Sequence, residues 1–359
     1  NLITNGSSDS ITIASGSHAI STGDGDETFT ISGGTVAVDS AGTSSSLTVN
    51  ITGGSGTLEL GQGTNQVSFA TTSTTTNAAW EVLGDTSGTD TIVLPVVSTG
   101  QQIQANNHQL VAPAYKIDFN DEIELIQLSD TAAISTFVST STKADFGNVD
   151  LELTINELVF QPTLNAGRLD VDATGDVTFE GDVVIDGDVD IDSTAANAVF
   201  TFGGNLQATG GGHIDVRRED LSNPGASTTI AVAGNIAAVD FVRLTAATTT
   251  VGGGVTADSI VIQTRDTYTV NQTYSAVDQI DIRVFGDDAD IVLKAGLNAG
   301  NSTRLIAPDG TVLLERQTTD VNVADALVAG NDITIAGATF QDHGVAAGDV
   351  LELADAARG

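Results

Sequence analysis

Apolar and polar residues alternate along the chain between Leu169 and Asp192. Every odd position in this stretch is apolar or small, and every even position except Val184 is polar. A period of two is typical of a β-strand that has one face on a core and one face in water. Glycine recurs every six residues from Gly175 to Gly187, so the stretch divides into hexads. Each hexad is predicted to form one short strand.

A hexad is too short to bury its own apolar face. Copies must therefore stack on one another, which is the organisation of a β-solenoid. The polar face of the hexads is made mostly of carboxylates, and like charges on neighbouring strands repel each other. The pattern thus requires a counter-charge, which either salt or a bound cation would supply.

Longer rungs with the same alternation follow the hexads, with Gly or Asn between them. The predicted core strands are Val199 to Phe202, His213 to Val216, Thr229 to Val232, Val242 to Ala246, Ser259 to Gln263, Ile280 to Phe285, Asp290 to Leu293, Thr311 to Leu314 and Ile333 to Ile335. We therefore expect a continuous parallel β-helix from about Leu164 to Phe340, within a third domain of residues 164–359.

The first 115 residues show short alternating runs separated by Gly, Ser and Asp clusters, which indicates strands joined by tight turns. We expect a sandwich-like or roll-like β domain at residues 1–115, with Trp80 in its core. Residues 116–163 carry longer apolar runs, and they are expected to form a connecting β module that caps the solenoid. A short helix is expected around Ser129 to Thr142. The predicted fold class is all-β, with an N-terminal β-rich region followed by a parallel β-helix.

Composition excludes several kinds of partner. The formal net charge is −35, and the first Lys or Arg of the chain is Lys116. Nucleic acids and anionic membrane surfaces need cationic side chains, so neither is an expected partner. The chain has no Cys and no Met, even at position 1, so we expect it to be processed from a precursor or to be part of a longer chain. No apolar run approaches the roughly 20 residues of a membrane helix.

Three short segments of the N-terminal region suggest calcium binding. GDGDETF at residues 23–29 resembles one calcium-binding nonapeptide of the RTX family, and GQGTNQV at 61–67 and GTDTI at 88–92 echo it. Glu27 and Asn65 stand where that pattern has its ligand Asp, and the copies are not consecutive. The alternative is a set of ordinary Gly/Asp-rich turns. The resemblance implies a Ca²⁺ site with these candidate ligands: Asp24, Asp26, Glu27 and Asp90.

A second group of carboxylates lies in the hexads. Asp186, Asp188 and Asp190 are further candidate Ca²⁺ ligands, and clustered acids on a β-helix also serve some glycosidases and polysaccharide lyases. Lyase chemistry would need basic and aromatic neighbours, yet Arg168 is the only Lys or Arg from residue 144 through residue 216. We therefore expect a solvated acidic face and no enzyme activity, with no catalytic residue assigned.

Two other features carry less chemistry. The four histidines are far apart in the sequence, and none belongs to a pair with metal-ligand spacing. Each is expected to be a lone polar or half-buried residue and not a zinc ligand. They are His18, His108, His213 and His343. The run RRED at residues 217–220 is interpreted as a mixed-charge loop that forms a local ion-pair patch, and the alternative is a contact with an acidic neighbour.

The amino-acid sequence of the second half of the chain resembles that of a known family. GDVTFEGDVVIDGDVDID, AGNIAAVDFVRLTA and AGNDITIAG look like the repeats of filamentous-haemagglutinin-like and autotransporter-type bacterial surface proteins. That resemblance implies a right-handed parallel β-helix. The hexads also fit the hexapeptide of left-handed β-helices, but the six-residue period does not persist.

These observations favour a secreted or cell-surface structural protein that assembles with itself into a surface layer, fibre or filament. The first alternative is an adhesin passenger, or a segment of a giant surface protein, that binds a receptor or a cell-surface glycan. The second is a β-helix carbohydrate-active enzyme. Ca²⁺ is the expected cofactor, and neither nucleic acid nor membrane insertion is expected.

Overall fold

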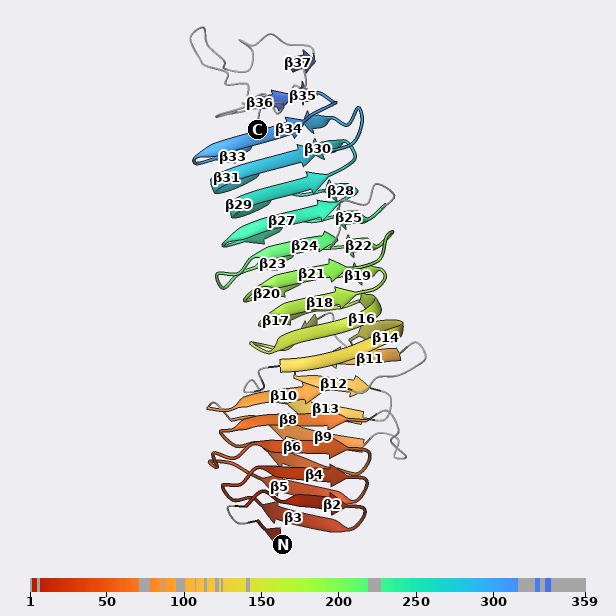
Figure 1. The fold of residues 1–359 in the computed structure, drawn as a ribbon, viewed down its shortest axis with the longest axis vertical. Helices are drawn as coiled ribbons and strands as arrows, with labels where there is room; N and C mark the ends of the chain where they lie inside the picture. The colour runs from red at the N-terminus through yellow and green to blue at the C-terminus, as the bar shows by residue number, and fades with distance from the viewer. Residues whose placement is uncertain are drawn as a thin grey trace. The chain divides into compact units, whose positions relative to one another are not determined.

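The structure is a computed structural model of the chain. It describes residues 2–4, 7–70, 78–85, 87–94, 101–106, 108–112, 115–119, 123, 125–139, 143–218, 227–315, 327–329 and 333–336. All regular elements among these residues are β-strands, and the chain is a parallel β-solenoid of about 13 turns (Figure 1). The predicted all-β class and β-helix are thus confirmed, while the right-handed sense stays a prediction. The chain divides into two compact units, Asn1–Ala173 and Thr174–Gly359.

Unit 1 contains the first eighteen strands. They are β1 (Leu2–Ile3), β2 (Ser10–Ile13), β3 (Ser17–Ser21), β4 (Glu27–Ile31), β5 (Thr35–Asp39), β6 (Leu47–Ile51), β7 (Ser55–Glu59), β8 (Thr64–Phe69), β9 (Ala78–Leu83), β10 (Thr89–Val93), β11 (Gln101–Asn106), β12 (Gln109–Ala112), β13 (Tyr115–Phe119), β14 (Leu125–Val138), β15 (Lys143–Asp145), β16 (Asp150–Phe160), β17 (Thr163–Ala166) and β18 (Leu169–Ala173).

The beginning of unit 1 is built from coils of two strands, where a coil is one full turn of the solenoid. The odd strands β1, β3, β5, β7 and β9 pair in parallel one after another, and the even strands from β2 to β10 do the same. Parallel coils therefore start at β1, well before residue 164. The arrangement is roll-like, whereas a sandwich would have antiparallel sheets. Trp80 is 1% exposed, so its predicted place in the core is confirmed.

The connecting segment of unit 1 differs from prediction at β14. The helix expected around Ser129 to Thr142 is wrong, because Leu125–Val138 forms a strand that pairs with β10, β11 and β16. The local sequence is rich in Ala, Ser and Thr and has no strong preference of its own, so the ladder with β16 decides its conformation. Strand β12 pairs in antiparallel fashion with β11 and with β13.

Unit 2 contains the remaining strands. They are β19 (Val177–Phe179), β20 (Val183–Ile185), β21 (Val189–Ser193), β22 (Val199–Phe202), β23 (Leu206–Ala208), β24 (Ile214–Arg218), β25 (Thr229–Val232), β26 (Ile236–Ala238), β27 (Phe241–Ala246), β28 (Thr248–Val251), β29 (Val255–Thr264), β30 (Tyr268–Val270), β31 (Tyr274–Val284), β32 (Ile291–Leu293), β33 (Leu297–Ala299), β34 (Ser302–Ala307), β35 (Val312–Glu315), β36 (Leu327–Ala329) and β37 (Ile333–Ala336). The predicted parallel strands of unit 2 are confirmed among the described residues. Residues 219–226, 316–326, 330–332 and 337–340 of the predicted β-helix lie outside the described residues, so its continuity there stays a prediction.

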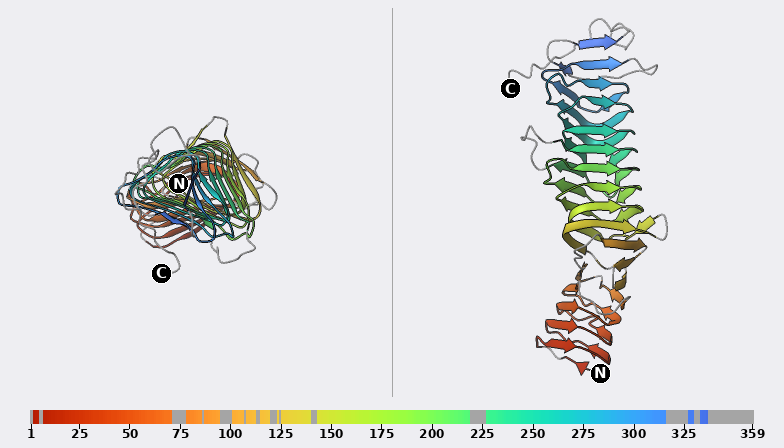
Figure 2. Two further views of the ribbon diagram at one scale, coloured as in Figure 1. Left: turned by 90° about the horizontal axis from the view of Figure 1, so that it is seen from above. Right: turned by 90° about the vertical axis from the view of Figure 1, so that its right-hand side faces the viewer.

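Three strands make one coil at the start of unit 2, so the three hexads occupy three different faces of the same coil. The expectation that the hexads stack on one another is therefore wrong, because each hexad stacks on a strand of the next coil. Strand β19 pairs with β22, β20 with β23, and β21 with β24, and the next coil of β25, β26 and β27 continues the three columns (Figure 1). The side view in Figure 2 shows the green strands of unit 2 stacked coil on coil. Carboxylates of successive hexads are consequently not neighbours across a strand pair.

The core of unit 2 lies inside the coils and follows the alternation of the hexads. Ile185 is fully buried, whereas the next residue, Asp186, is exposed. Phe179 stacks on Phe202 of the following coil, with ring centroids 5.5 Å apart. At the corner before β24, a Cβ atom on Gly212 would lie 1.9 Å from a backbone oxygen of the preceding coil, so only glycine fits there.

A ladder of polar side chains, here called the asparagine ladder, runs along the corner before β20, β23, β26 and β29. The carboxylate of Asp182 accepts hydrogen bonds from the backbone and side-chain nitrogens of Asn205. The side-chain oxygen of Asn205 accepts in the same way from Asn235, and that of Asn235 accepts from the backbone N–H of Gly254. Each coil is thus joined to the next by a side chain as well as by the strand ladder.

Candidate functional site

The aspartates that follow the hexad glycines bind the backbone of the next coil. Each carboxylate accepts a hydrogen bond from an N–H group that stands 23 to 25 residues further on. The pairs are Asp176 with Val199 (2.8 Å), Asp182 with Asn205 (2.6 Å) and Asp188 with His213 (3.1 Å). The Gly-Asp motif therefore has a structural role at the corners. Its carboxylates accept hydrogen bonds from backbone N–H groups that the short strands leave unpaired.

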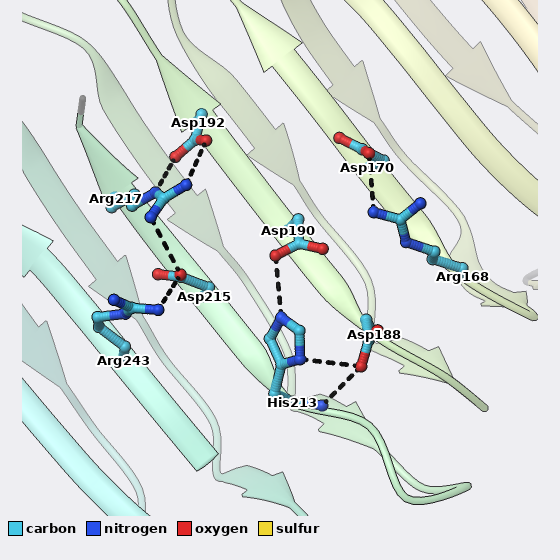
Figure 3. A network of polar contacts seen from close by, with 9 residues as sticks. All are labelled: Arg168, Asp170, Asp188, Asp190, Asp192, His213, Asp215, Arg217 and Arg243. Atoms are coloured by element: carbon cyan, nitrogen blue, oxygen red, sulfur yellow. Dashed lines mark hydrogen bonds and ion pairs between the residues drawn. The ribbon is translucent and has the colours of Figure 1, made fainter. Parts of the chain in front are cut away.

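His213 bridges two of the predicted metal ligands. Its Nδ1 lies 2.9 Å from Oδ1 of Asp188, and its Nε2 lies 3.0 Å from Oδ1 of Asp190 (Figure 3). Ionised carboxylates only accept hydrogen bonds, so both contacts are made only when both ring nitrogens carry a proton. The ring also stacks on Phe241 of the next coil, at 4.5 Å between centroids. His213 is half-buried, as expected, but it is not a lone residue.

A chain of charges continues from this histidine along the outside of β21, β24 and β27. Arg217 holds Asp192 through Nε at 2.9 Å and reaches Asp215 at 3.6 Å, while Arg243 lies 2.7 Å from Asp215 (Figure 3). The guanidinium of Arg243 also sits 5.2 Å from the ring centroid of Phe241, within range of a cation–π contact. Anions of one coil are thus neutralised by cations of the following coils.

Asp215 and Arg217 lie in the middle of this chain, and the pKa of each is raised by a different cause. Asp215 is only 4% exposed, and burial raises its pKa although Arg243 and Arg217 act against the rise. The hydrogen bond with Asp192 is the main cause that raises the pKa of Arg217. Arg217 lies in β24 and pairs with Asp192 of the preceding coil and with Asp215. The ion-pair patch predicted within residues 217–220 stays a prediction, because residues 219 and 220 lie outside the described residues.

The three hexad candidates are not gathered into one site. Asp188 and Asp190 meet through His213, whereas Asp186, on the other side of Gly187 in the same β20–β21 corner, is exposed and lies 3.4 Å from the Thr209 hydroxyl. In unit 1, Arg168 pairs with Asp170 at 3.0 Å. Across the described parts of the chain, no group of three or more His, Asp or Glu side chains is placed to hold a metal ion.

The calcium-like segments of unit 1 fall on one corner, the one that precedes the even strands. Strands β4, β6, β8 and β10 are neighbours in that order, so Glu27, Asn65 and Asp90 belong to one column. Asp24 and Asp26 are exposed there, and Asp26 accepts a hydrogen bond from the backbone N–H of Ser46 at 3.0 Å. The four candidates therefore divide into two exposed and two buried carboxylates.

The buried Asp90 is satisfied within the chain. Its Oδ1 accepts from the side-chain nitrogen of Asn65 at 2.7 Å, and its Oδ2 accepts from the backbone N–H of Asp85 at 2.9 Å. The same Asn65 nitrogen donates to the carbonyl of Gly61 at 2.7 Å, and the Asn65 oxygen accepts from the backbone N–H of Leu47. An amide nitrogen thus sits among oxygens at this point of the corner.

The buried Glu27 is not satisfied. Glu27 is only 1% exposed. Its Oε1 accepts a hydrogen bond from the Thr4 hydroxyl at 3.2 Å, whereas its Oε2 has no hydrogen-bond partner. Burial raises the pKa of Glu27 above its usual 4.5, and the nearby Asp9 and Asp26 add to the rise, against the hydrogen bond from Thr4. Glu27 is therefore the carboxylate of the corner that most needs a counter-charge.

Sequence reasoning missed His213, Arg217, Arg243 and Phe241 as partners of the hexad carboxylates. Basic and aromatic residues are absent from the sequence around the hexad carboxylates, but the next two coils place them nearby in the folded chain. The available signal was the alternation of His213, Asp215 and Arg217 on one strand face, which repeats the spacing of Asp188, Asp190 and Asp192.

Among the described residues, no helix has the length and apolarity needed to span a membrane. Comparison with protein-family models, with curated proteins and with solved structures found no match for this chain.

Proposed function

We propose that this chain is a structural protein of the cell exterior, which assembles with itself into a surface layer, fibre or filament. The observation that carries the proposal is the use of the polar side chains: they join one coil to the next. The corner aspartates, the asparagine ladder and the charge chain of β21, β24 and β27 all run between coils of unit 2. Such repeated cross-links suit a load-bearing element, in which each coil is held by its neighbours.

The resemblance to filamentous-haemagglutinin-like and autotransporter-type surface proteins supports the same assignment. A parallel β-helix is the fold that this resemblance implies, and a high negative charge suits a soluble, exposed protein. The partner expected first is another copy of the chain. A cell-surface glycan is the partner under the adhesin alternative.

Electron microscopy of the purified full chain tests this proposal. Ordered fibres or sheets are expected as protein concentration rises, and light scattering should increase in parallel. The matched control is Ile185→Asp, which disturbs the core of one coil and should prevent ordered assembly. Isolated particles at all concentrations and salt conditions would favour the adhesin alternative.

The enzyme alternative gains one observation, since His213, Arg217, Arg243 and Phe241 now lie beside the carboxylates. Each of these groups is engaged with another side chain, however, and the Phe241 ring contacts both His213 and Arg243. A panel of glycan and uronate polymers should therefore show no turnover above background. Turnover that disappears in Asp190→Asn or Asp215→Asn would overturn the structural assignment.

A further inference from the structure

Two buried oxygens without a partner lie at the same corner of unit 1, between β3 and β4. They are Oε2 of Glu27 and the hydroxyl of Thr22, in residues that are 1% and 7% exposed. Thr22 and Glu27 are the first and last residues of a six-residue segment that forms this turn. Thr4 of the preceding coil makes hydrogen bonds near both ends of the segment. The Thr4 hydroxyl donates to Glu27 and accepts from the backbone N–H of Gly23. A buried oxygen without a donor is costly, and a carboxylate oxygen more so than a hydroxyl.

No Lys or Arg of the first 115 residues is available to neutralise Glu27 at this corner. Residues 1–115 contain neither Lys nor Arg, and the charged neighbours that act on Glu27 are Asp9 and Asp26. The field at the corner is therefore negative from both sides. A group that neutralises Glu27 has to be a proton or a cation from solution.

The same corner two coils further on shows how the chain fills the equivalent space when it can. There the side-chain nitrogen of Asn65 donates to Gly61 O at 2.7 Å, to Asp90 Oδ1 at 2.7 Å and to Gly63 O at 3.4 Å. One N–H₂ group thus lies among three oxygens, two from the backbone and one from a carboxylate. Glu27 follows Gly23 and Gly25 with the spacing by which Asn65 follows Gly61 and Gly63, but it offers an oxygen where Asn65 offers a donor.

We propose that a hard metal cation binds inside the β3–β4 corner, with the Glu27 carboxylate and the Thr22 hydroxyl as its side-chain ligands. Backbone carbonyls and water complete the shell, because cations such as Ca²⁺ take six to eight oxygens. One carboxylate in the shell makes the site a weak one, suited to the millimolar Ca²⁺ found outside cells. The exposed Asp24 and Asp26 and the satisfied Asp90 are not ligands of this site.

The site differs from a metal cluster of several acids. It rests on one buried carboxylate, one hydroxyl and the turn between them, so it does not need three acidic side chains. It also does not depend on the proposed self-assembly, because it lies within single coils of one chain.

Calcium binding to the purified full chain tests the proposal. Equilibrium dialysis in NaCl of fixed ionic strength should give saturable binding of Ca²⁺, and the thermal midpoint should rise with Ca²⁺ and level off. In Glu27→Gln the isosteric amide brings its own N–H₂ group, as Asn65 does, so the calcium-dependent rise should disappear. In Asp26→Asn, the control at an exposed carboxylate of the same turn, the rise should persist.

A gain-of-site variant sharpens the test. Asn65→Asp removes the donor from the second oxygen shell and adds a carboxylate beside Asp90, so the number of bound Ca²⁺ ions should increase by one relative to the wild type. An unchanged calcium response in Glu27→Gln, or no difference between CaCl₂ and NaCl for the wild type, would overturn the proposal. The second of these results would mean that Glu27 is neutralised by a proton alone.

Discussion

Replacing Ile185 with Asp tests the central physical claim, which is that odd hexad positions face a thin apolar core. Ile185 is fully buried in β20, opposite Ala208 of β23. Loss of the buried side chain costs roughly 2 to 3 kcal/mol at about 25 cal/mol per Å² of apolar surface. The new carboxyl group must also be neutral in such a place, and protonating it at pH 7 costs about 4 kcal/mol, since three pH units separate pH 7 from the usual pKa of Asp.

The sum of about 6 kcal/mol approaches the whole stability of a typical domain. Solenoids do not unfold as one unit, so the loss should appear first in the coils around the substitution. Hydrogen exchange measured peptide by peptide is the suitable assay. Amides of β19 to β24 should lose most of their protection, whereas those of β2 to β8 in unit 1 should keep theirs.

The neighbouring substitution Asp186→Asn is the matched control. Asp186 is exposed and its contact with the Thr209 hydroxyl is long, so the change should stay within about 0.5 kcal/mol. Equal loss of protection in the two variants would refute the assignment of inward and outward positions. No loss in either would show that residues 177–208 do not form the coil described here.

Three further outcomes follow. His213→Leu removes the imidazole that contacts both Asp188 and Asp190, so the free energy of unfolding of unit 2 in urea should fall by about 1 to 3 kcal/mol. A loss that does not change with added salt would contradict the electrostatic explanation. In calcium-free buffer, Glu27→Gln should be more stable than the wild type at neutral pH, and the difference should vanish as the pH falls below 4.5. The reason is that the folded state raises the pKa of Glu27, so ionisation above that range opposes folding; a difference that grows towards acid pH would contradict this. The buried hydroxyls of Tyr268 and Tyr274 hydrogen-bond each other, and burial raises the pKa of Tyr274 to about 12. Stability should therefore be intact below pH 10 and be lost between pH 10 and about 12, with tyrosinate absorbance appearing together with unfolding.

Much of the local structure was predictable from the sequence because the alternation is strict. Strands β22 and β25 have the predicted boundaries, and the inward Val, Ile and Phe side chains from Val177 to Ile191 are all buried. Three-residue strands such as β23 and β26 were missed, because runs like LQA and IAA are too short to show a period.

The contacts between coils were not predictable in the same way. Which strand lies beside a hexad depends on the length of the whole coil, and no local pattern encodes that length. Asp188 and His213 are 25 residues apart, so their contact could not be read from either neighbourhood. For the same reason, the satisfied state of Asp90 and the unsatisfied state of Glu27 emerge only when the corner of unit 1 is assembled.

The asparagine ladder of unit 2 bears on how such a chain can change over evolutionary time. Its successive steps span 23, 30 and 19 residues, yet each step makes the same side-chain contact with the following coil. Residues can therefore be inserted or deleted between rungs without shifting the rungs themselves. A gene encoding this architecture can lengthen, shorten or duplicate individual coils while the stack is preserved, so its descendants can keep a common backbone after any fixed repeat length has been erased from their sequences.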